Sequence, residues 1–351
     1  MLQSLPAKIV DRLCFCKLTT QKHNSSDLQT EHCYSMDIKS ERTDLMDAIQ
    51  TIGLCKRYGN KNAVNNLSIQ VPKGSVYGFI GRNGAGKSTT QRMICDLASP
   101  SAGEIKLFEH PVTDPIVRRK IGTLIEQPGI YLGMSALENV ILQGYSIGLE
   151  NPKKSALEAL DAVGLSKAVK KKAKHLSLGM KQRLGLAIAM LGNPELLILD
   201  EPINGLDPEG IVQLREVIAN LHQDRGVTIF ISSHILGELS KIATHYGMIK
   251  GGELIEQTSA EELANKRKDY LTVKVEDAEK AAQLLSKKLH IPAMEVVSSR
   301  EIHLPGFQDT AAVNRILYSN NYNVEEVFLH QQDLEEYFIE LMGGTDHESY
   351  F

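Results

Sequence analysis

Residues 81–88, GRNGAGKS, fit the phosphate-loop pattern GxxxxGK[ST]. An apolar run, Val76–Ile80, precedes the pattern and a helical pattern through residue 97 follows it, as the motif requires. The glycines let successive N–H groups face phosphate oxygens, and the helix N-terminus adds partial positive charge. A glycine-rich turn with an incidental lysine is the alternative. The residues expected to hold the phosphates are Gly81, Asn83, Gly84, Ala85, Gly86, Lys87, Ser88 and Thr89, with Ser88 also a Mg²⁺ ligand.

A second apolar run, residues 196–199, ends in two adjacent carboxylates, Asp200 and Glu201. In phosphate-loop folds such a strand end lies beside the loop. Because side chains alternate along a strand, Asp200 can face the water shell of the metal while Glu201 points elsewhere and acts as general base on the attacking water. The alternative is a solvated strand terminus. We therefore expect Asp200 to be a metal ligand and Glu201 to be catalytic.

Apolar runs typical of buried parallel strands occur at 76–80, 195–200 and 227–232, with helical patterns between them. This alternation predicts a three-layer α/β core. Residues 67–71 alternate apolar with polar side chains and predict a half-buried antiparallel strand in a separate layer. Residues 125–175 read instead as an inserted helical subdomain.

Two helix signals support the inserted subdomain. Ser135 and Glu138 form a capping-box pair, and a second helix is expected to open at Asn151 and Pro152 and to close at Gly164. The helical subdomain is expected to cover about residues 127–192.

Three parts are predicted along the chain. Residues 1–45 show no sustained periodicity and are expected to be a poorly ordered extension, or to precede a true start at Met36 or Met46. Residues 46–258 form the nucleotide-binding domain. Residues 259–351 follow the Gly251–Gly252 hairpin signal with a βαββαβ order, which suggests a small ferredoxin-like α+β domain with a final helix at 334–342.

Composition excludes several classes of protein. The chain has 351 residues, 42% hydrophobic and 23% charged, with a formal net charge of −4, so no basic excess points to a nucleic-acid partner. The longest apolar stretches, such as 184–191, fall far short of the roughly 20 residues that span a bilayer, and no secretory signal is expected. Five cysteines, an odd number, favour reduced thiols in a cytoplasmic protein.

A helix start of unusual composition lies between the two phosphate-site motifs. Residues 176–180 read LSLGM, and Ser177 can cap a helix that runs to about residue 191, where Gly192-Asn193-Pro194 ends it. The N–H groups of its first turn would then face an anion. An ordinary capped amphipathic helix is the alternative.

In this order, the phosphate loop, LSLGM and Asp200-Glu201 resemble the ATP-binding-cassette (ABC) ATPases, whose signature usually reads LSGGQ. The chain departs from that signature at Leu178 and Met180, but it keeps Ser177 and Gly179. The sequence LSLGMKQR and the C-terminal extension look like those of the ATPases of bacitracin- and lantibiotic-resistance transporters.

The resemblance implies ATP and Mg²⁺ as cofactors and two ATPs held between two copies of the chain, or between it and a homologous subunit. Ser177 and Gly179 would contact the ATP of the other subunit. It also implies a separate transmembrane permease, a place on the cytoplasmic face of the membrane, and export of, or protection against, an antimicrobial peptide.

Four further site residues follow from the resemblance. His234, after the apolar run 227–233, matches the switch histidine that touches the γ-phosphate, and Gln127 matches the glutamine that reads Mg²⁺ and signals to the permease. Tyr58 matches the aromatic residue that stacks on adenine. Asp207, in the D-loop at residues 204–208, contacts nucleotide and can also cap the helix that Pro208 begins. Taken alone, these residues could equally be a structural histidine, a turn glutamine, a turn tyrosine and a helix cap.

Other functions fit less well. A soluble ABC ATPase of translation, repair or regulation would usually carry tandem motif sets or a long coiled coil, and this chain has one set and no sustained heptads. A GTPase or small-molecule kinase would leave LSLGM unexplained. In a degenerate regulator we would not expect Lys87, Asp200, Glu201 and His234 all to be intact. The sequence therefore favours a transporter ATPase.

Overall fold

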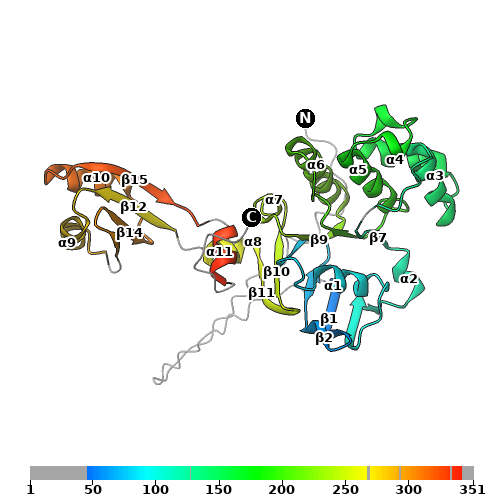
Figure 1. Cartoon of the computed structure of the whole chain (residues 1–351), viewed down its shortest axis with the longest axis horizontal. Coiled ribbons are helices and arrows are strands. Elements are labelled where there is room, and N and C mark those ends of the chain that lie inside the picture. The colour runs from blue at the N-terminus through cyan, green and yellow to red at the C-terminus, as the bar shows by residue number, and fades with distance from the viewer. Residues whose placement is uncertain (1–45, 127, 267–268, 292–293, 333, 342–351) are drawn as a thin grey trace, which may run out of the picture. The chain divides into compact units, whose positions relative to one another are not determined.

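The computed structural model describes residues 46–126, 128–266, 269–291, 294–332 and 334–341. The predicted extension 1–45 and the predicted site residue Gln127 lie outside the described residues. Figure 1 shows the arrangement of the helices and strands.

The core of the nucleotide-binding part is a six-stranded sheet in the order β11-β10-β4-β9-β8-β7. Its strands run parallel except for the β10–β11 hairpin, which turns at Gly251 and Gly252 as expected from the sequence. The strands are β4 (Val76–Ile80), β7 (Ile121–Leu124), β8 (Leu196–Asp200), β9 (Thr228–Ser233), β10 (His245–Lys250) and β11 (Glu253–Ser259).

Alternate residues of these strands enter two different hydrophobic cores. On one face Tyr77 and Phe230 stack with ring centroids 5.4 Å apart, in the core that also holds Met93 of helix α1 and the antiparallel sheet. On the other face Leu199 and Ile231 pack with α5 (Leu178–Ala189) and α6. Both faces of the sheet are covered, which confirms the predicted three-layer α/β core. The flanking helices are α1 (Lys87–Ile94), α6 (Pro208–Arg225) and α7 (Leu236–Leu239).

A second, antiparallel sheet has the order β2-β1-β5-β6, with β3 also paired to β1. Its strands are β1 (Asp47–Tyr58), β2 (Lys61–Leu67), β3 (Gln70–Pro72), β5 (Ala102–Leu107) and β6 (His110–Pro111). The expected single strand over 67–71 is wrong, because β2 ends at Leu67 and β3 begins at Gln70. The Thr51 hydroxyl lies at the break: it donates to Leu67 O at 3.0 Å and accepts from Ile69 N at 3.0 Å.

The inserted helical subdomain contains the signals expected from the sequence. The Ser135 hydroxyl accepts from Glu138 N at 3.2 Å and the Glu138 carboxylate accepts from Ser135 N at 2.6 Å, so the capping box is confirmed. Gly164, at φ 69°, follows the second helix. The helices are α2 (Pro115–Arg118), before the subdomain, then α3 (Ala136–Ser146), α4 (Pro152–Ala162) and α5 (Leu178–Ala189), with 3₁₀ turns at Ser166–Ala168 and Ala173–His175.

The C-terminal region forms a third sheet with the antiparallel order β13-β14-β12-β15. Helices α9 and α10 share one core with this sheet, and the ferredoxin-like assignment and the 258/259 boundary stay predictions. The elements are β12 (Tyr270–Val275), α9 (Ala278–Leu289), β13 (Glu295–Ser298), β14 (Glu301–Pro305), α10 (Thr310–Ser319) and β15 (Val324–His330).

Two helices on either side of this sheet in the chain belong to a different core. They are α8 (Ala260–Lys266) and α11 (Leu334–Leu341). Leu263, Leu334 and Phe338 are buried in the hydrophobic core that also holds residues of α5, α6 and α7, and α11 packs next to α7. The Tyr337 hydroxyl donates to a Glu256 carboxylate oxygen at 2.8 Å. Both helices therefore pack on the nucleotide-binding part. None of the helices in the described part of the chain has the length and apolar composition needed to cross a bilayer.

Candidate nucleotide site

The phosphate loop lies where three neighbouring parallel strands end. It follows β4, which pairs with β9, and β9 pairs with β8, so the residues after all three strands meet at one edge of the sheet. Ile80 is paired with Ser233, and Asp200 with Ser232. The carboxyl ends of parallel strands are where α/β folds bind ligands. This topology brings together the loop, Asp200-Glu201 and His234.

Glycine is required at several positions of the loop. Gly84 and Gly86 have φ values of 81° and 112°, in the left-handed region that other residues avoid. A Cβ atom at Gly86 would lie 2.6 Å from Ala63 O, and one at Gly81 would lie 2.6 Å from Ile249 O. At Gly81 and Gly86 the backbone is therefore packed against β10 and β2 with no room for a side chain, whereas Gly84 is required by its backbone conformation alone. Gly252 N also donates to Ala85 O at 2.9 Å, which ties the loop to the β10–β11 turn.

Lys87 begins α1 and is only 5% exposed. Its ammonium donates to Gly81 O at 2.6 Å and to Arg82 O at 3.3 Å, and it lies 3.2 Å from Glu201 Oε1. The lysine charge is thus held over the loop itself. Ser88 and Thr89 follow Lys87 in the first turn of α1, and both side chains are partly exposed. Asn83, earlier in the loop, is exposed.

Asp200 and Glu201 differ in burial and backbone conformation. Asp200 is the last residue of β8 and 5% exposed, and its Oδ1 accepts from the Ser232 hydroxyl at 2.7 Å. Glu201 lies past the strand end at φ 47°, and its N–H donates to the same hydroxyl at 3.0 Å. The expectation that strand alternation separates the two carboxylates is wrong, because the chain leaves the strand at Glu201. A left-handed turn separates them instead.

His234 follows β9 and contacts the other carboxylate oxygen of Glu201. Its Nδ1 lies 2.6 Å from Glu201 Oε2, and the imidazole is 35% exposed. Glu201 therefore lies between Lys87 and His234, with one oxygen toward each. Lys87, Glu201 and His234, which lie at least 33 positions apart in the chain, thus form one charged cluster at the mouth of the loop.

Tyr58 ends β1 and is 50% exposed. The Lys56 ammonium lies 5.1 Å from the centroid of its ring and also donates to Ser99 O at 2.5 Å. This cation therefore covers one face of the ring.

Ser177 caps α5 as predicted, and its hydroxyl accepts from Met180 N at 3.3 Å. Gly179 lies in the first turn of the helix. A Cβ atom there would be 3.6 Å from its nearest neighbour, Leu206 Cδ2, which is ordinary contact. Nothing in the described part of the chain therefore requires glycine at residue 179. Asp207 Oδ1 accepts from Gly210 N at 3.1 Å, so its capping of α6 is confirmed.

Two polar residues that were not predicted support the site. Ser232 bridges the Asp200 carboxylate and the Glu201 backbone, as described above. Gln91 is fully buried behind the loop, where its Nε2 donates to Leu199 O at 3.0 Å and joins α1 to β8. The position of Ser232, at the polar end of an apolar run and two residues before His234, could have predicted its role from the sequence. Gln91 gave no signal, because its partner is a backbone carbonyl.

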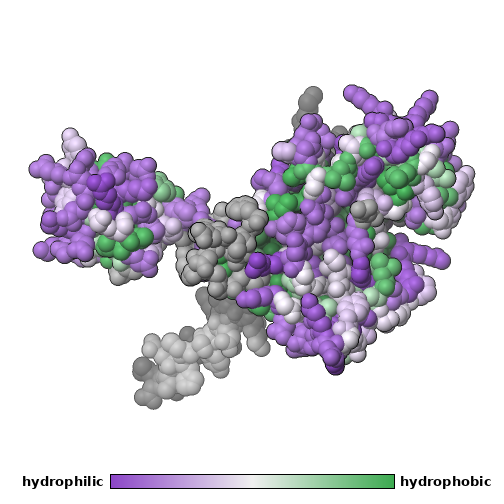
Figure 2. Space-filling view, viewed as in Figure 1, coloured by the Kyte–Doolittle hydropathy of each residue, from purple (hydrophilic) through white to green (hydrophobic). Residues whose placement is uncertain are grey.

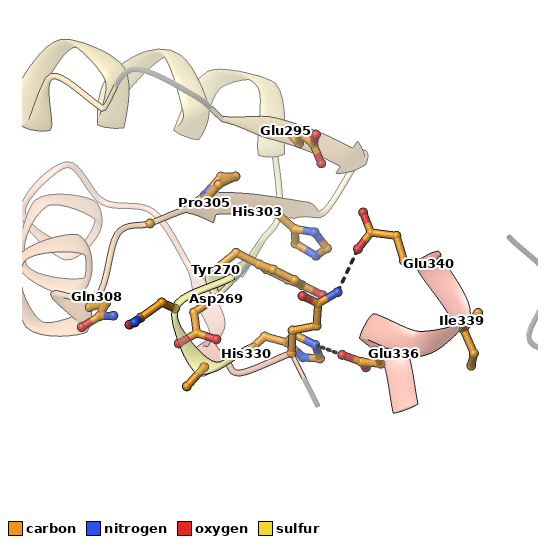
Figure 3. A pocket seen from close by; sticks show the side chains of 14 residues that line it. Asp269, Tyr270, Glu295, His303, Pro305, Gln308, His330, Glu336, Ile339 and Glu340 are labelled. Atoms are coloured by element: carbon orange, nitrogen blue, oxygen red, sulfur yellow. Dashed lines mark hydrogen bonds and ion pairs between the residues drawn. The ribbon is translucent and has the colours of Figure 1, made fainter. Parts of the chain in front are cut away.

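A separate cavity of about 830 Å³ lies in the C-terminal region, and none of the predicted nucleotide residues lines it. Figure 3 shows the side chains that line it, which include those of Tyr270, His303 and His330 on the third sheet and Glu336 and Glu340 on α11. The Tyr270 ring lies between two imidazoles, with centroids 4.2 Å from His303 and 4.5 Å from His330. His330 Nε2 also lies 3.0 Å from a Glu336 carboxylate oxygen. The nucleotide site is thus not at this cavity.

The fold and the site define a phosphate-loop nucleotide-binding cassette. The ABC transporter family model matches residues 64–204. A cassette solved as a dimer in a post-hydrolysis state with ADP and Pi is 25% identical and superposes with a TM-score of 0.56, covering 60% of this chain and 98% of that one.

Relatives define the family more closely. The bacitracin transport ATP-binding protein BcrA of Bacillus licheniformis is 40% identical over 300 residues, 84% of this chain and 97% of the relative. The lantibiotic transport ATP-binding protein SrtF of Streptococcus pyogenes is 45% identical over 202 residues, 58% of this chain and 86% of the relative. The chain belongs to the ATP-binding proteins of ABC transporters. It is an ATP-hydrolysing enzyme.

Proposed function

We propose that this chain drives a membrane transporter that exports, or protects against, an antimicrobial peptide such as bacitracin or a lantibiotic. The observation that carries the proposal is the 40% identity to BcrA, which extends over 84% of this chain and 97% of that relative. The similarity is therefore not confined to the motifs that all ABC ATPases share.

The charged cluster at the loop supports the proposed catalytic roles. Glu201 is held by contacts to Lys87 and His234, and its backbone is fixed by Ser232. A phosphate at the loop would compete with Glu201 for the Lys87 ammonium and release one carboxylate oxygen toward a water molecule. Glu201 would then act as general base, with His234 and Gln127 contacting the γ-phosphate side of the site.

The oxygen donors at the loop fit Mg²⁺. Ser88 supplies a hydroxyl in the first turn of α1, and Asp200 supplies a buried carboxylate of which Oδ1 is bonded to Ser232. Magnesium takes such oxygen ligands together with substrate phosphates. We assign Ser88 and Asp200 as its protein partners, with Gln127 as a third. The bound ion would neutralise phosphate charge.

A nucleotide-sandwich dimer accounts for the signature. Within the described residues nothing requires glycine at residue 179, yet the chain keeps it beside the helix cap Ser177. A partner that approaches this helix start closely would require it. We propose that this partner is the ATP held by a second copy or a homologous subunit, with Tyr58 stacking on adenine and Asp207 lying near the nucleotide.

A surface of the helical subdomain supports a permease partner. Five large hydrophobic side chains on α3 and in the segment before it are exposed, and hydrophobic residues gather over this subdomain on the face drawn in Figure 2. Such patches often mark protein contacts. The five residues are Tyr131, Leu132, Met134, Leu142 and Tyr145. Docking here would hold the chain at the cytoplasmic face of the membrane.

The test is co-expression with the product of the neighbouring reading frame, if that frame encodes about six hydrophobic spans. A transporter subunit is expected to purify with that product from membranes, and the pair should raise the bacitracin or lantibiotic concentration that cells survive. The Lys87→Ala chain should co-purify without protecting. A chain that shows full ATPase activity, no membrane partner and no effect on survival would instead be a soluble non-transport ABC ATPase.

A further inference from the structure

Leu178, where the chain departs from the usual signature, lies against the D-loop of its own protomer. Its Cδ2 is 3.2 Å from the position of a Cβ atom at Gly205, and the side chain is 49% exposed. Gly205 has φ 72°, so the D-loop turns there in the left-handed region. The leucine thus lies on the side of the turn where a side chain at residue 205 would stand.

A second contact lies beside the first. Leu206 Cδ2 is 3.6 Å from the position of a Cβ atom at Gly179, and Leu206 itself packs against the core shared by α5 and α6. Two adjacent residues of the signature therefore face two adjacent residues of the D-loop. A glycine at residue 178 would leave the Gly205 contact unmade.

The D-loop turn starts at the proposed general base. Asn204 N donates to Glu201 O at 3.1 Å, and Leu206 N donates to Ile203 O at 3.3 Å. Between the Glu201 carboxylate and the cap residue Ser177 lie only this short turn and the Leu178 contact. A displacement of the signature is therefore passed to the backbone of Glu201 through a few packed atoms.

We infer that Leu178 is a positioning residue that couples the two ATP sites of the dimer. The inference rests on the proposed function, in which Ser177 and Gly179 face the partner's ATP while Glu201 faces the ATP on its own loop. When Ser177 and Gly179 contact the partner's ATP, Leu178 is pressed against Gly205. This contact fixes the conformation of the turn that carries Glu201, which acts on the ATP bound by its own phosphate loop. Coupling needs such a contact that differs between the two states.

The experiment compares ATP hydrolysis as a function of ATP concentration in the full chain. Leu178→Ala removes the contact, Leu178→Met keeps an apolar side chain of similar reach, and Leu157→Ala truncates a comparable leucine on α4, 42% exposed. The parent is expected to show a Hill coefficient between 1 and about 2, the limit for two sites. Leu178→Ala should fall to about 1 while its melting temperature stays that of the parent. Leu178→Met and Leu157→Ala should keep the parent coefficient.

A purely structural leucine would lower the melting temperature and leave the Hill coefficient unchanged, and that result overturns the inference. So does a parent Hill coefficient of 1. Light scattering of the Glu201→Gln chain with ATP measures whether the dimer forms. It therefore distinguishes failure of the coupling role of Leu178 from failure of the proposed function. If that variant forms a dimer but the parent is not cooperative, only the coupling role of Leu178 is wrong. If no dimer forms, the sandwich itself is wrong.

Discussion

Lys87 Nζ and Glu201 Oε1 lie 3.2 Å apart, although their residues come from the phosphate loop and from the end of a different strand. The other Glu201 oxygen contacts His234. A single carboxylate thus links the residue that would bind phosphate with the residue that would sense it. Because both contacts involve the Glu201 carboxylate, the first variant to test is one that removes its charge.

Glu201→Gln keeps the shape of the side chain but removes the charge and the basicity. We expect the variant to bind ATP and to accumulate as an ATP-bound dimer, because a glutamine cannot accept the proton of the attacking water. Hydrolysis should fall by at least about 100-fold, the lower range for loss of a general base. Phosphate release and light scattering measure both effects. Hydrolysis at the parent rate would show that another group is the base.

Lys87→Ala should weaken ATP binding far more than it weakens the fold. Loss of charged hydrogen bonds to phosphate costs about 1.5–3 kcal/mol, or roughly 10- to 150-fold in Kd. Glu201 would still be paired with His234, which limits the loss of stability. Titration calorimetry and thermal melting give the two quantities. Lys73→Ala is the matched control, because Lys73 pairs with Glu195 and belongs to no predicted site. Equal loss of affinity in both variants would contradict the assignment.

Ser177→Asp separates helix capping from contact with the partner's ATP. Aspartate caps helices as well as serine does, so α5 should remain and the melting temperature should change little. The added carboxylate would face the partner's γ-phosphate, and hydrolysis should fall at least about 10-fold through like-charge repulsion. Ser177→Ala instead loses the cap, at about 1 kcal/mol. Hydrolysis at the parent rate by Ser177→Asp would show that Ser177 does not contact the ATP of the other subunit.

Stability is expected to fall as the pH drops below about 6.5, in part because of His245. Burial lowers the pKa of His245 from 6.5, and the charge of Glu262 opposes this only partly. The unfolded chain therefore binds a proton at higher pH than the folded chain does, and stability is lost as the pH falls from the unfolded toward the folded pKa. Urea unfolding at pH 7.5 and 5.5 measures the loss. His245→Gln cannot take the proton and should show a smaller difference between the two pH values.

Local patterns located much of the fold. β4 has the limits that the sequence predicted, and α3 begins directly after the predicted cap Ser135, because hydrophobic periodicity and helix caps depend on residues that are neighbours in the sequence. The break between β2 and β3 was missed, since it depends on the Thr51 hydroxyl from a distant part of β1. The phosphate loop, Asp200, Glu201 and His234 meet where the strands end, as expected from the sequence. The left-handed turn at Glu201 and the contact of Leu178 with Gly205 could not be predicted, because each depends on the path of the chain after β8.

Helices α8 and α11, which flank the C-terminal sheet in the chain, pack into the same core as α5 and α6. Leu334 and Phe338 are 2% and 4% exposed there. In chain topology, residues 270–330 are therefore inserted between two helices that are both anchored in that core. Ending the chain at residue 258 would expose the apolar side chains that α8 and α11 cover and would favour aggregation. Joining α8 to α11 with a short linker would remove the third sheet but keep this core covered.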